Sequence, residues 1–482
     1  MKKRDLISLV FFLLLILIIT MDSALFLPNE VLIAADLGIY FDVIGIIIAA
    51  YTIINGISIL IFGYLTDLIE RKKILMLAGF LWSITAILHL FVENFWQLIL
   101  VRIIAAIAVS VTTPLVISYL ADVIKSDSRS KSFAFWGLLS TFGSLFAGIA
   151  ALAFNTIDFE AINLPLLQKI DYIAANYPNV LYTWRLPYFY LGIIALIFTI
   201  LNFIITKEPK RAAKEKQLEK IISDEEIRYS YKIKFSDLKF VLKRKSNFFL
   251  MFNFFDVIAS GLLVAYIFPY IQLEIGVNFI DIKVIILLLF VGVLGLIIGQ
   301  FGLAHWGDKR VQKGDLSGRV KVAVICSILT LPLLLFAFAM SPNVTSSSFF
   351  FGTLVVNDAL FWVLWIIYSL FMGFGLAFTM GIGPNWYSSL IDVNLVENRG
   401  TMVAVGSFID TIGRALGAFI GGQVVDLTGS FSTTIFWSTL VFGIFSLCFW
   451  IPLFFTAEKD YIEVNEIMKE RALTLKGTKV SE

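Results

Sequence analysis

Charged side chains inside apolar stretches are the residues of this chain best suited to do chemistry. Five of them interrupt segments that otherwise hold aliphatic and aromatic residues: Asp22, Arg102, Asp256, Asp410 and Arg414. An ionisable group at the centre of a membrane helix costs about 2.5–3.5 kcal/mol by insertion scales, so it persists only where it is paired, hydrated or neutralised. Such residues mark pathways for protons, ions or polar parts of a substrate.

The first three residues have distinct expected roles. Asp22 is the candidate for proton coupling, because a carboxyl group in an alternately wet and dry cavity can bind and release a proton; the alternative is a neutral acid that fixes helix packing. Arg102 can neutralise Asp22 or grip an anionic head group with two bonds, although its place near a helix end also allows snorkelling to the interface. Asp256 suits a cationic substrate or a second proton, unless it only packs against Asn253.

The remaining candidates are weaker. Asp410 and Arg414 are spaced i, i+4, which favours an internal ion pair over a role in substrate binding. Aromatic and amide side chains in membrane helices mostly pack or sit at the interface. Five of them are nevertheless candidates to line a cavity: Tyr51, Asn55, Tyr266, Trp362 and Trp365.

The composition explains why these charges matter. Of 482 residues, 59% are hydrophobic and only 15% are charged, far more apolar than a soluble core requires. The chain is therefore expected to be an integral membrane protein. Its formal net charge of +2 argues against a nucleic-acid partner. No phosphate-binding loop, nucleophile–base pair or metal-ligand spacing stands out, so we expect neither an enzyme nor a cofactor or metal.

Apolar runs long enough to cross a bilayer predict about twelve membrane helices at 1.5 Å rise per residue. They cover residues 6–27, 43–66, 74–92, 96–121, 132–154, 186–206, 247–271, 283–305, 321–340, 357–382, 401–425 and 431–455. These spans predict four parts: an N-terminal bundle (1–206), a charged cytoplasmic linker (207–246), a C-terminal bundle (247–456) and a cytoplasmic tail (457–482). We expect an all-α fold of two pseudo-symmetric six-helix bundles.

A gapless internal repeat supports this division. Residues 114–143 recur at 384–413. The matched positions include Pro114, Ser118, Asp122, Arg129 and Gly143, which reappear as Pro384, Ser388, Asp392, Arg399 and Gly413. Six helices per half would give both copies one orientation, as in a parallel repeat. Lysine and arginine gather in the loops of one side and are missing from those of the other, so the positive-inside rule predicts that both termini are cytoplasmic.

Charged residues at the predicted cytoplasmic ends of helices are candidates for gating. Carboxylates at the membrane edge can meet a helix N-terminus or an arginine only while an inner gate is shut; the alternative is that they are ordinary interfacial anchors. Three acid–arginine pairs fit this description: Asp67 with Arg71, Asp122 with Arg129, and Asp392 with Arg399.

One of these loops resembles a known family. Gly63, Asp67, Arg71 and Lys72 are similar to the signature loop of the major facilitator superfamily, and Gly302, Asp308, Lys309 and Arg310 resemble its counterpart in the second half. The resemblance implies twelve helices in two bundles, with the first, fourth, seventh and tenth lining a central cavity.

Within that superfamily, several short sequence segments resemble those of the Spinster branch. They are Met21–Asp22, residues 62–67 and 95–102, Ala121 and Asp122 with Arg129 and Ser130, and residues 236–245. This resemblance implies a lysophospholipid-like or sphingoid substrate.

Together these features predict a secondary transporter of the plasma membrane that works as a monomer by alternating access, coupled to protons through Asp22. The scarcity of polar groups at mid-bilayer favours an amphipathic or lipophilic, drug-like or lipid-like substrate. One rival is a transporter of a small polar solute, a sugar or an organic anion. Another is a membrane sensor that does not transport.

Overall fold

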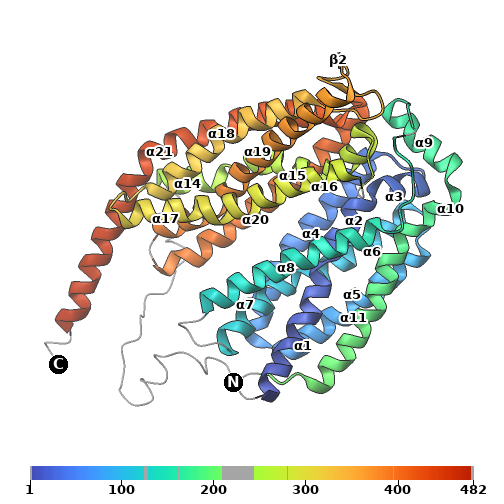
Figure 1. Ribbon diagram of the computed structural model, residues 1–482. Helices are drawn as coiled ribbons and strands as arrows, with labels where there is room; N and C mark the ends of the chain where they lie inside the picture. The colour runs from blue at the N-terminus through green and yellow to red at the C-terminus, as the bar shows by residue number, and fades with distance from the viewer. Residues whose placement is uncertain are drawn as a thin grey trace. The chain divides into compact units, whose positions relative to one another are not determined.

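The computed structural model describes residues 3–123, 129–160, 162–208, 244–278, 281–394 and 396–478. These residues are almost entirely helical (Figure 1). Within them, nine helices are long and apolar enough to cross a membrane, and one bent pair makes a tenth. The prediction of an all-helical membrane protein is confirmed. Most of the predicted linker (207–246) lies outside the described residues.

The chain divides into two compact units, Met1–Ile157 with Leu164–Tyr229, and Asp158–Asn163 with Ser230–Glu482. The helices of the first unit are α1 (Lys3–Thr20), α2 (Asp22–Phe26), η1 (Leu27–Asn29), α3 (Glu30–Leu37), α4 (Phe41–Leu68), α5 (Arg71–Leu88), η2 (His89–Phe91), α6 (Phe95–Ser110), α7 (Thr112–Val123), α8 (Arg129–Leu152), α9 (Leu166–Asn176), α10 (Pro178–Leu181), η4 (Tyr182–Trp184) and α11 (Arg185–Ile205).

The second unit contains the remaining helices and one short hairpin. They are α14 (Lys245–Phe252), α15 (Phe255–Pro269), the π-helix η5 (Tyr270–Ile275), α16 (Ile282–Phe290), the π-helix η6 (Val291–Leu303), α17 (Ala304–Gln312), α18 (Gly318–Met340), β1 (Ser348–Phe349) paired antiparallel with β2 (Leu354–Val355), α19 (Asp358–Asp392), α20 (Val396–Thr428) and α21 (Phe431–Thr478).

Three predicted spans are interrupted in the structure, the fourth (96–121) at Val111 between α6 and α7 and two others beside a candidate residue. The first, predicted as 6–27, is interrupted at Met21, where the chain bends by 42° before α2 begins at Asp22. The seventh, predicted as 247–271, is interrupted between α14 and α15. The breaks in the first and seventh spans lie next to a candidate residue, Asp22 or Asp256, so each carboxylate stands in the first turn of a new helix.

The predicted spans leave residues 28–42 as a connection, but most of this stretch is helical in the structure. Pro28 stands at the start of η1, where its missing N–H needs no partner. The chain then continues as α3, whose residues 30–35 are all buried. The mainly apolar sequence of α3 explains this, since burial removes its Val, Leu, Ile and Ala side chains from water.

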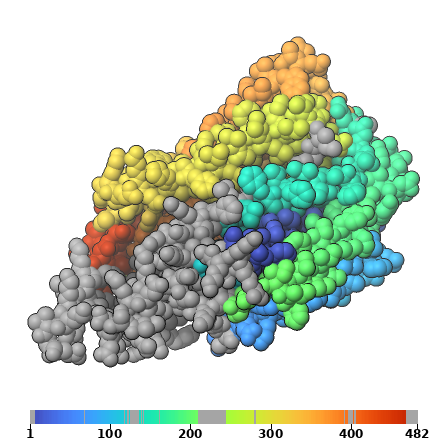
Figure 2. All heavy atoms as spheres, turned by 60° about the horizontal axis from the view of Figure 1, so that its bottom comes forward, coloured from blue at the N-terminus to red at the C-terminus, as the bar shows by residue number. Residues whose placement is uncertain are grey.

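Apolar side chains on the outside of the first unit fit a lipid environment. One face of α11 exposes Ile193, Ile197, Ile200, Phe203 and Ile204, at helical spacing. Figure 2 shows this helix as a continuous green surface. Its opposite face packs against α1 and α5 and buries Tyr188, Thr199 and Asn202. A soluble protein would not leave so large an apolar face open to water.

In the second unit, α15 and α20 pack through a seam of glycines. A Cβ atom at Gly417 would contact the backbone of α15, at the carbonyl oxygen of Ile258 and at 2.8 Å from the nitrogen of Leu262. A Cβ at Gly261 would lie 2.7 Å from the Cα of Arg414. Small residues at such crossings let membrane helices approach closely. The seam holds the α15 residue Asp256 near Asp410 and Arg414 of α20.

Glu274 caps the N-terminus of α21 in the second unit. Its carboxylate accepts hydrogen bonds from the backbone nitrogens of Phe431 (2.6 Å) and Ser432 (2.9 Å), in the first turn of α21. The hydroxyls of Ser341 and Ser430 also donate to it, at 3.3 and 3.1 Å. A carboxylate at a helix N-terminus satisfies otherwise unpaired N–H groups and interacts favourably with the helix dipole. This contact fixes where the last long helix begins.

The glycine seam yields a test. Gly417→Ala is expected to lower the free energy of unfolding by about 1–3 kcal/mol, because the added methyl group meets backbone atoms that cannot move aside. Gly292→Ala is the matched control, since a Cβ there meets nothing within 4 Å. Thermal unfolding of both purified variants in one detergent measures the effect. Equal melting temperatures would contradict close packing at the seam.

Candidate functional site

A buried ion pair forms the centre of the first unit. A terminal guanidinium nitrogen of Arg102 on α6 donates to the Asp22 carboxylate at 2.7 Å, and the two side chains are only 3% and 1% exposed. The second carboxylate oxygen accepts from the indole N–H of Trp82 on α5 at 3.0 Å. The pairing anticipated from the sequence is therefore present, and Arg102 does not snorkel to the interface.

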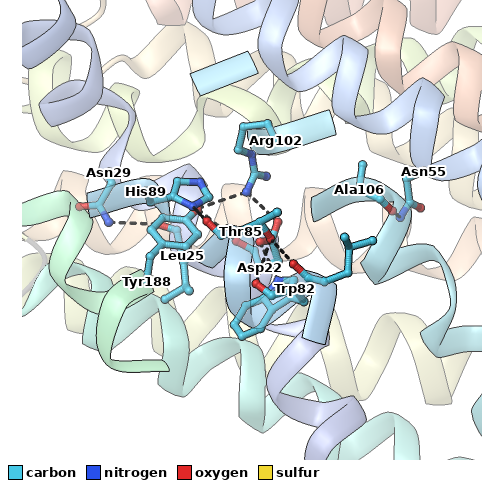
Figure 3. Close-up of polar contacts among 11 residues, drawn as sticks. Asp22, Leu25, Asn29, Asn55, Trp82, Thr85, His89, Arg102, Ala106 and Tyr188 are labelled. Carbon is cyan, nitrogen blue, oxygen red and sulfur yellow. Dashed lines mark hydrogen bonds and ion pairs between the residues drawn. The ribbon is translucent and has the colours of Figure 1, made fainter. Parts of the chain in front are cut away.

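Aromatic side chains from α2, α4 and α11 enclose Arg102. Its guanidinium lies over the rings of Phe26 (4.6 Å) and Tyr51 (4.2 Å). It also donates to the hydroxyl of Tyr188 at 3.3 Å (Figure 3). That hydroxyl in turn donates to the backbone carbonyl of Asp22 at 3.5 Å. Desolvated cation–π contacts contribute about 2 kcal/mol or more each. The aromatic cage thus supplies part of the stabilisation that water would otherwise give the cation.

A histidine lies behind this cage. The ring of His89 stacks on Tyr188 with centroids 4.0 Å apart, and its Nδ1 lies 2.8 Å from the carbonyl oxygen of Thr85. The Nε2 atom of His89 and the Nε atom of Arg102 are buried without a hydrogen-bond partner. Two nitrogens beside the ion pair are therefore left for water or for a polar group of a ligand.

A large cavity opens in the second unit. Its volume is about 370 Å³, within the range that holds small organic ligands. The wall is apolar along Val257, Leu263, Leu376, Met380 and Trp386. The polar and charged lining residues are Asn253, Asp256, Ser260, Gln300, Thr379, Tyr387, Asp410 and Arg414.

This cavity brings together three of the five charged candidates. Asp256 comes from α15, and Asp410 and Arg414 come from α20. The expected ion pair between Asp410 and Arg414 is not formed: the ion pairs within 4 Å in the described part of the chain do not include it. Both side chains line the cavity instead of closing on each other, which leaves one cationic and two acidic groups facing the same space.

Three other predicted residues have packing roles in this structure. Asn55 donates to the carbonyl of Ala106 at 3.1 Å and ties α4 to α6. Tyr266 is fully buried and donates to the carbonyl of Ala418 at 2.7 Å, on the far side of the glycine seam. Trp362 is partly buried on α19 and lines neither the ion-pair cage nor the large cavity.

The gating candidates are described only in part. Arg71 meets the carboxylate of Glu208 at 3.5 Å, and the backbone nitrogen of Lys72 donates to the same carboxylate at 2.9 Å. Asp392 pairs with Arg319, which also binds Asp308 at 2.8 Å. The side chains of Asp67, Asp122, Arg129 and Arg399 lie outside the described residues. Their gating role stays a prediction.

The turn between α17 and α18 carries a second charge cluster. Asp315 accepts from Arg310 at 2.8 Å and from Lys321 at 2.7 Å. Burial alone would raise the pKa of Asp315, but the two cations beside it lower the pKa below its ordinary value. The loop carboxylate therefore stays charged and keeps the turn closed.

Sequence reasoning missed several residues. Trp82 and Tyr188 contact the ion pair, yet an aromatic residue in an apolar run gives no signal that separates it from ordinary packing. Glu30 is fully buried, and neither of its carboxylate oxygens has a hydrogen-bond partner. It was overlooked because its segment was taken for a loop. Gln300 was detectable, as an amide within the most hydropathic of the described spans.

Comparison with known proteins agrees with this architecture. A model of the Major Facilitator Superfamily matches residues 12–356. The crystal structure of a bacterial homolog of the human lysosomal transporter Spinster, inward-facing and occupied, superposes with a TM-score of 0.68 at 17% identity, covering 95% of this chain and 99% of that one. A D-xylose–proton symporter superposes with a TM-score of 0.59 at 15% identity, covering 92% and 97%.

Similarity to curated proteins is partial. The arabinose–proton symporter of Bacillus subtilis is 27% identical over 35% of this chain and 33% of its own length. The quinolone resistance protein NorA of Staphylococcus aureus is 20% identical over 41% of this chain and 44% of its own length. The matched segments thus span less than half of these relatives.

The chain belongs to the Major Facilitator Superfamily. It is a multi-pass membrane transporter and not an enzyme, and its fold resembles that of the bacterial Spinster homolog.

The buried Asp22–Arg102 pair allows a test that distinguishes the loss of charge compensation from the loss of packing. Arg102→Met is expected to lower the free energy of unfolding by about 3–5 kcal/mol, because it leaves the Asp22 carboxylate buried without its cation. The double variant Asp22→Asn/Arg102→Met should lose less than Arg102→Met alone, since no charge remains to be compensated. Thermal unfolding in detergent measures all three proteins. A double variant as unstable as Arg102→Met would contradict a charge effect.

Proposed function

We propose that this protein is a secondary active transporter that works by alternating access, is coupled to protons through Asp22, and moves an amphipathic substrate. The observation that carries the coupling is the buried Asp22–Arg102 pair. Its charges compensate each other in a site enclosed by aromatic side chains, so protonation of one partner changes the charge of the whole site.

The coupling follows from charge balance. Ionised Asp22 holds the Arg102 guanidinium at 2.7 Å. A proton on Asp22 removes the negative charge and leaves Arg102 uncompensated, which is costly in a dry interior. The guanidinium then needs water, so protonation of Asp22 favours a state in which this site is hydrated. One proton crossing 100 mV provides about 2.3 kcal/mol to drive that change.

The large cavity supports an amphipathic substrate. Its aliphatic and aromatic wall suits a hydrocarbon portion, while Arg414 suits a phosphate and Asp256 and Asp410 suit an ammonium group. A zwitterionic head group, as in a lysophospholipid, presents both charges. The similarity of the fold to the bacterial Spinster homolog supports the same class of substrate.

A small polar solute is the second candidate. Asn253, Gln300 and Trp386 line the same cavity, and amides beside an indole ring suit the hydroxyls and apolar face of a sugar. Partial similarity to the arabinose–proton symporter points the same way. A membrane sensor that does not transport is a third candidate. The absence of any substrate flux across the membrane would distinguish it from a transporter.

The proposal also includes the membrane, the orientation and the oligomeric state of the transporter. The loop distribution of lysine and arginine supports cytoplasmic termini. The proposed transporter works as a monomer in the plasma membrane. Rocking of the two bundles around a substrate site, with the acid–arginine pairs as gates, would provide alternating access.

Proton coupling is tested in proteoliposomes. We expect wild-type protein to take up or release a lysophospholipid faster when a pH gradient is imposed. Asp22→Asn should lose this pH dependence, because an amide cannot bind the coupled proton. The exposed carboxylate Asp358 gives the control Asp358→Asn, which should behave like wild type. Gradient-driven transport that survives in Asp22→Asn would reject Asp22 as the coupling group.

The substrate class is tested by binding. Thermal stabilisation of purified protein is measured with lysophospholipids, sphingoid bases, cationic drugs and pentoses. We expect a zwitterionic lipid to stabilise the protein, and Arg414→Gln to weaken its binding about 10- to 100-fold, since a charge-assisted hydrogen bond contributes about 1.5–3 kcal/mol. Stabilisation by pentoses alone, unchanged in Arg414→Gln, would favour the polar-solute alternative.

A further inference from the structure

A second, much smaller pocket lies behind the large cavity. It has a volume of about 40 Å³ and is enclosed by α15, α18, α19 and α21. A water molecule needs about 10–15 Å³ and a drug-sized ligand about 300 Å³ or more. The pocket therefore has room for an ion or a few waters, but not for an organic substrate.

Oxygen-bearing side chains from four helices are among the residues that line this pocket, although most of its exposed surface is apolar. One carboxylate, Asp256, faces a group of hydroxyls from all four helices. They belong to Ser260, Ser327, Thr330, Thr379, Thr439 and Ser446. Carboxylate and hydroxyl oxygens are the ligands that hard cations prefer.

Several of these hydroxyls are already oriented by the backbone. Ser260 donates its hydroxyl proton to the carbonyl of Val257 at 3.3 Å, and Thr379 donates to the carbonyl of Gly375 at 2.9 Å. Because a hydroxyl has one proton and two lone pairs, a donor used in this way leaves its oxygen able to accept or to ligate. These groups are therefore ready to bind a cation.

Two lining oxygens accept no hydrogen bond within the described residues, although the Trp450 indole and the Arg414 guanidinium lie near the Asp256 carboxyl group. The Ser446 side chain is 1% exposed and its hydroxyl makes no hydrogen bond. The Oδ1 atom of Asp256 is also buried without a hydrogen bond. Within the described residues, Asp256 is in no ion pair either, and Arg414 lines the large cavity but not the small pocket. A buried carboxylate and a buried hydroxyl left unsatisfied at one place indicate a missing ligand.

We propose that this pocket binds one dehydrated Na⁺ ion, with Asp256 and Ser446 among its ligands. One carboxylate carries one negative charge, so a monovalent cation makes the site neutral. A divalent ion would leave a positive charge inside the membrane, at high cost. Water alone would leave the carboxylate uncompensated. The smaller Na⁺ ion approaches a carboxylate oxygen more closely than K⁺ and is therefore attracted more strongly.

The site has a consequence for the large cavity. Asp256, Ser260 and Thr379 line both the small pocket and the large cavity. An ion bound in the small pocket therefore neutralises a carboxylate that also lines the large cavity. Bound Na⁺ thus reduces the negative charge offered to a ligand there. The cation site is independent of proton coupling at Asp22, which lies in the other unit.

The proposal is tested on the full-length purified protein without substrate or pH gradient, so that its failure is separate from any failure of the transport assays. Thermal unfolding is followed as NaCl replaces choline chloride at constant total salt and pH. We expect Na⁺ to raise Tm saturably, with K⁺ much weaker. Binding of ²²Na⁺ should approach one ion per chain.

Variants identify the ligands. Asp256→Asn should abolish the Na⁺-dependent rise in Tm, and Ser446→Ala should weaken apparent Na⁺ affinity roughly tenfold or more, as loss of one supporting group at a metal site does. Ser369→Ala is the control, because Ser369 is equally buried and unpartnered but lines neither cavity.

Three results would overturn the site. The first is equal Tm in Na⁺, K⁺ and choline. The second is a Na⁺ response that Asp256→Asn and Ser446→Ala both retain. The third is a Tm that follows pH through Asp256 and ignores Na⁺, which would assign the pocket to a proton. If Asp256→Asn does not fold, Ser446→Ala and ²²Na⁺ binding to wild type still decide the matter.

Discussion

The need to compensate charge in a dry interior governs the functional parts of this protein. Water is absent from the centre of a bilayer, so each buried carboxylate or guanidinium must find a counter-charge, a donor or a hydrated cavity. In the first unit that need is met by the Asp22–Arg102 pair. Trp82 and Tyr188 add donors, and Phe26 and Tyr51 add aromatic faces. Helix breaks and crossings there serve to bring these groups together.

The second unit meets the same constraint differently. Its intramembrane charges Asp256, Asp410 and Arg414 form no ion pair within 4 Å in the described residues but line cavities, where a ligand, an ion or water can compensate them. The glycine seam makes this arrangement possible, because close approach of α15 and α20 places Asp256 beside Asp410 and Arg414. One unit therefore holds a closed ion pair and the other holds open, charged space, although the two halves of the sequence share a repeat.

This difference between the two units suggests that they have different functions. A compensated pair changes its charge when a proton binds, which suits coupling, whereas uncompensated groups around an apolar cavity suit the recognition of a ligand. The repeat itself supplies the scaffold and not the chemistry. Of its charged positions, Asp392 is held by Arg319 at a helix end and contacts neither cavity. The residues with proposed roles all lie outside the matched positions, with the exception of the gate candidates.

Local properties of the chain were sufficient to establish its class. Hydropathy and span length determined that it is a helical membrane protein, and the high cost of a charge in an apolar run identified Asp22, Arg102 and Asp256. Only the tertiary structure decided the partners. Trp82 and Tyr188 reach Asp22 from 60 and 166 residues away, and Asp410 and Arg414 face a cavity instead of each other because α15 packs on α20. Periodicity is encoded within one segment, but which helices become neighbours depends on many weak contacts summed over the whole chain.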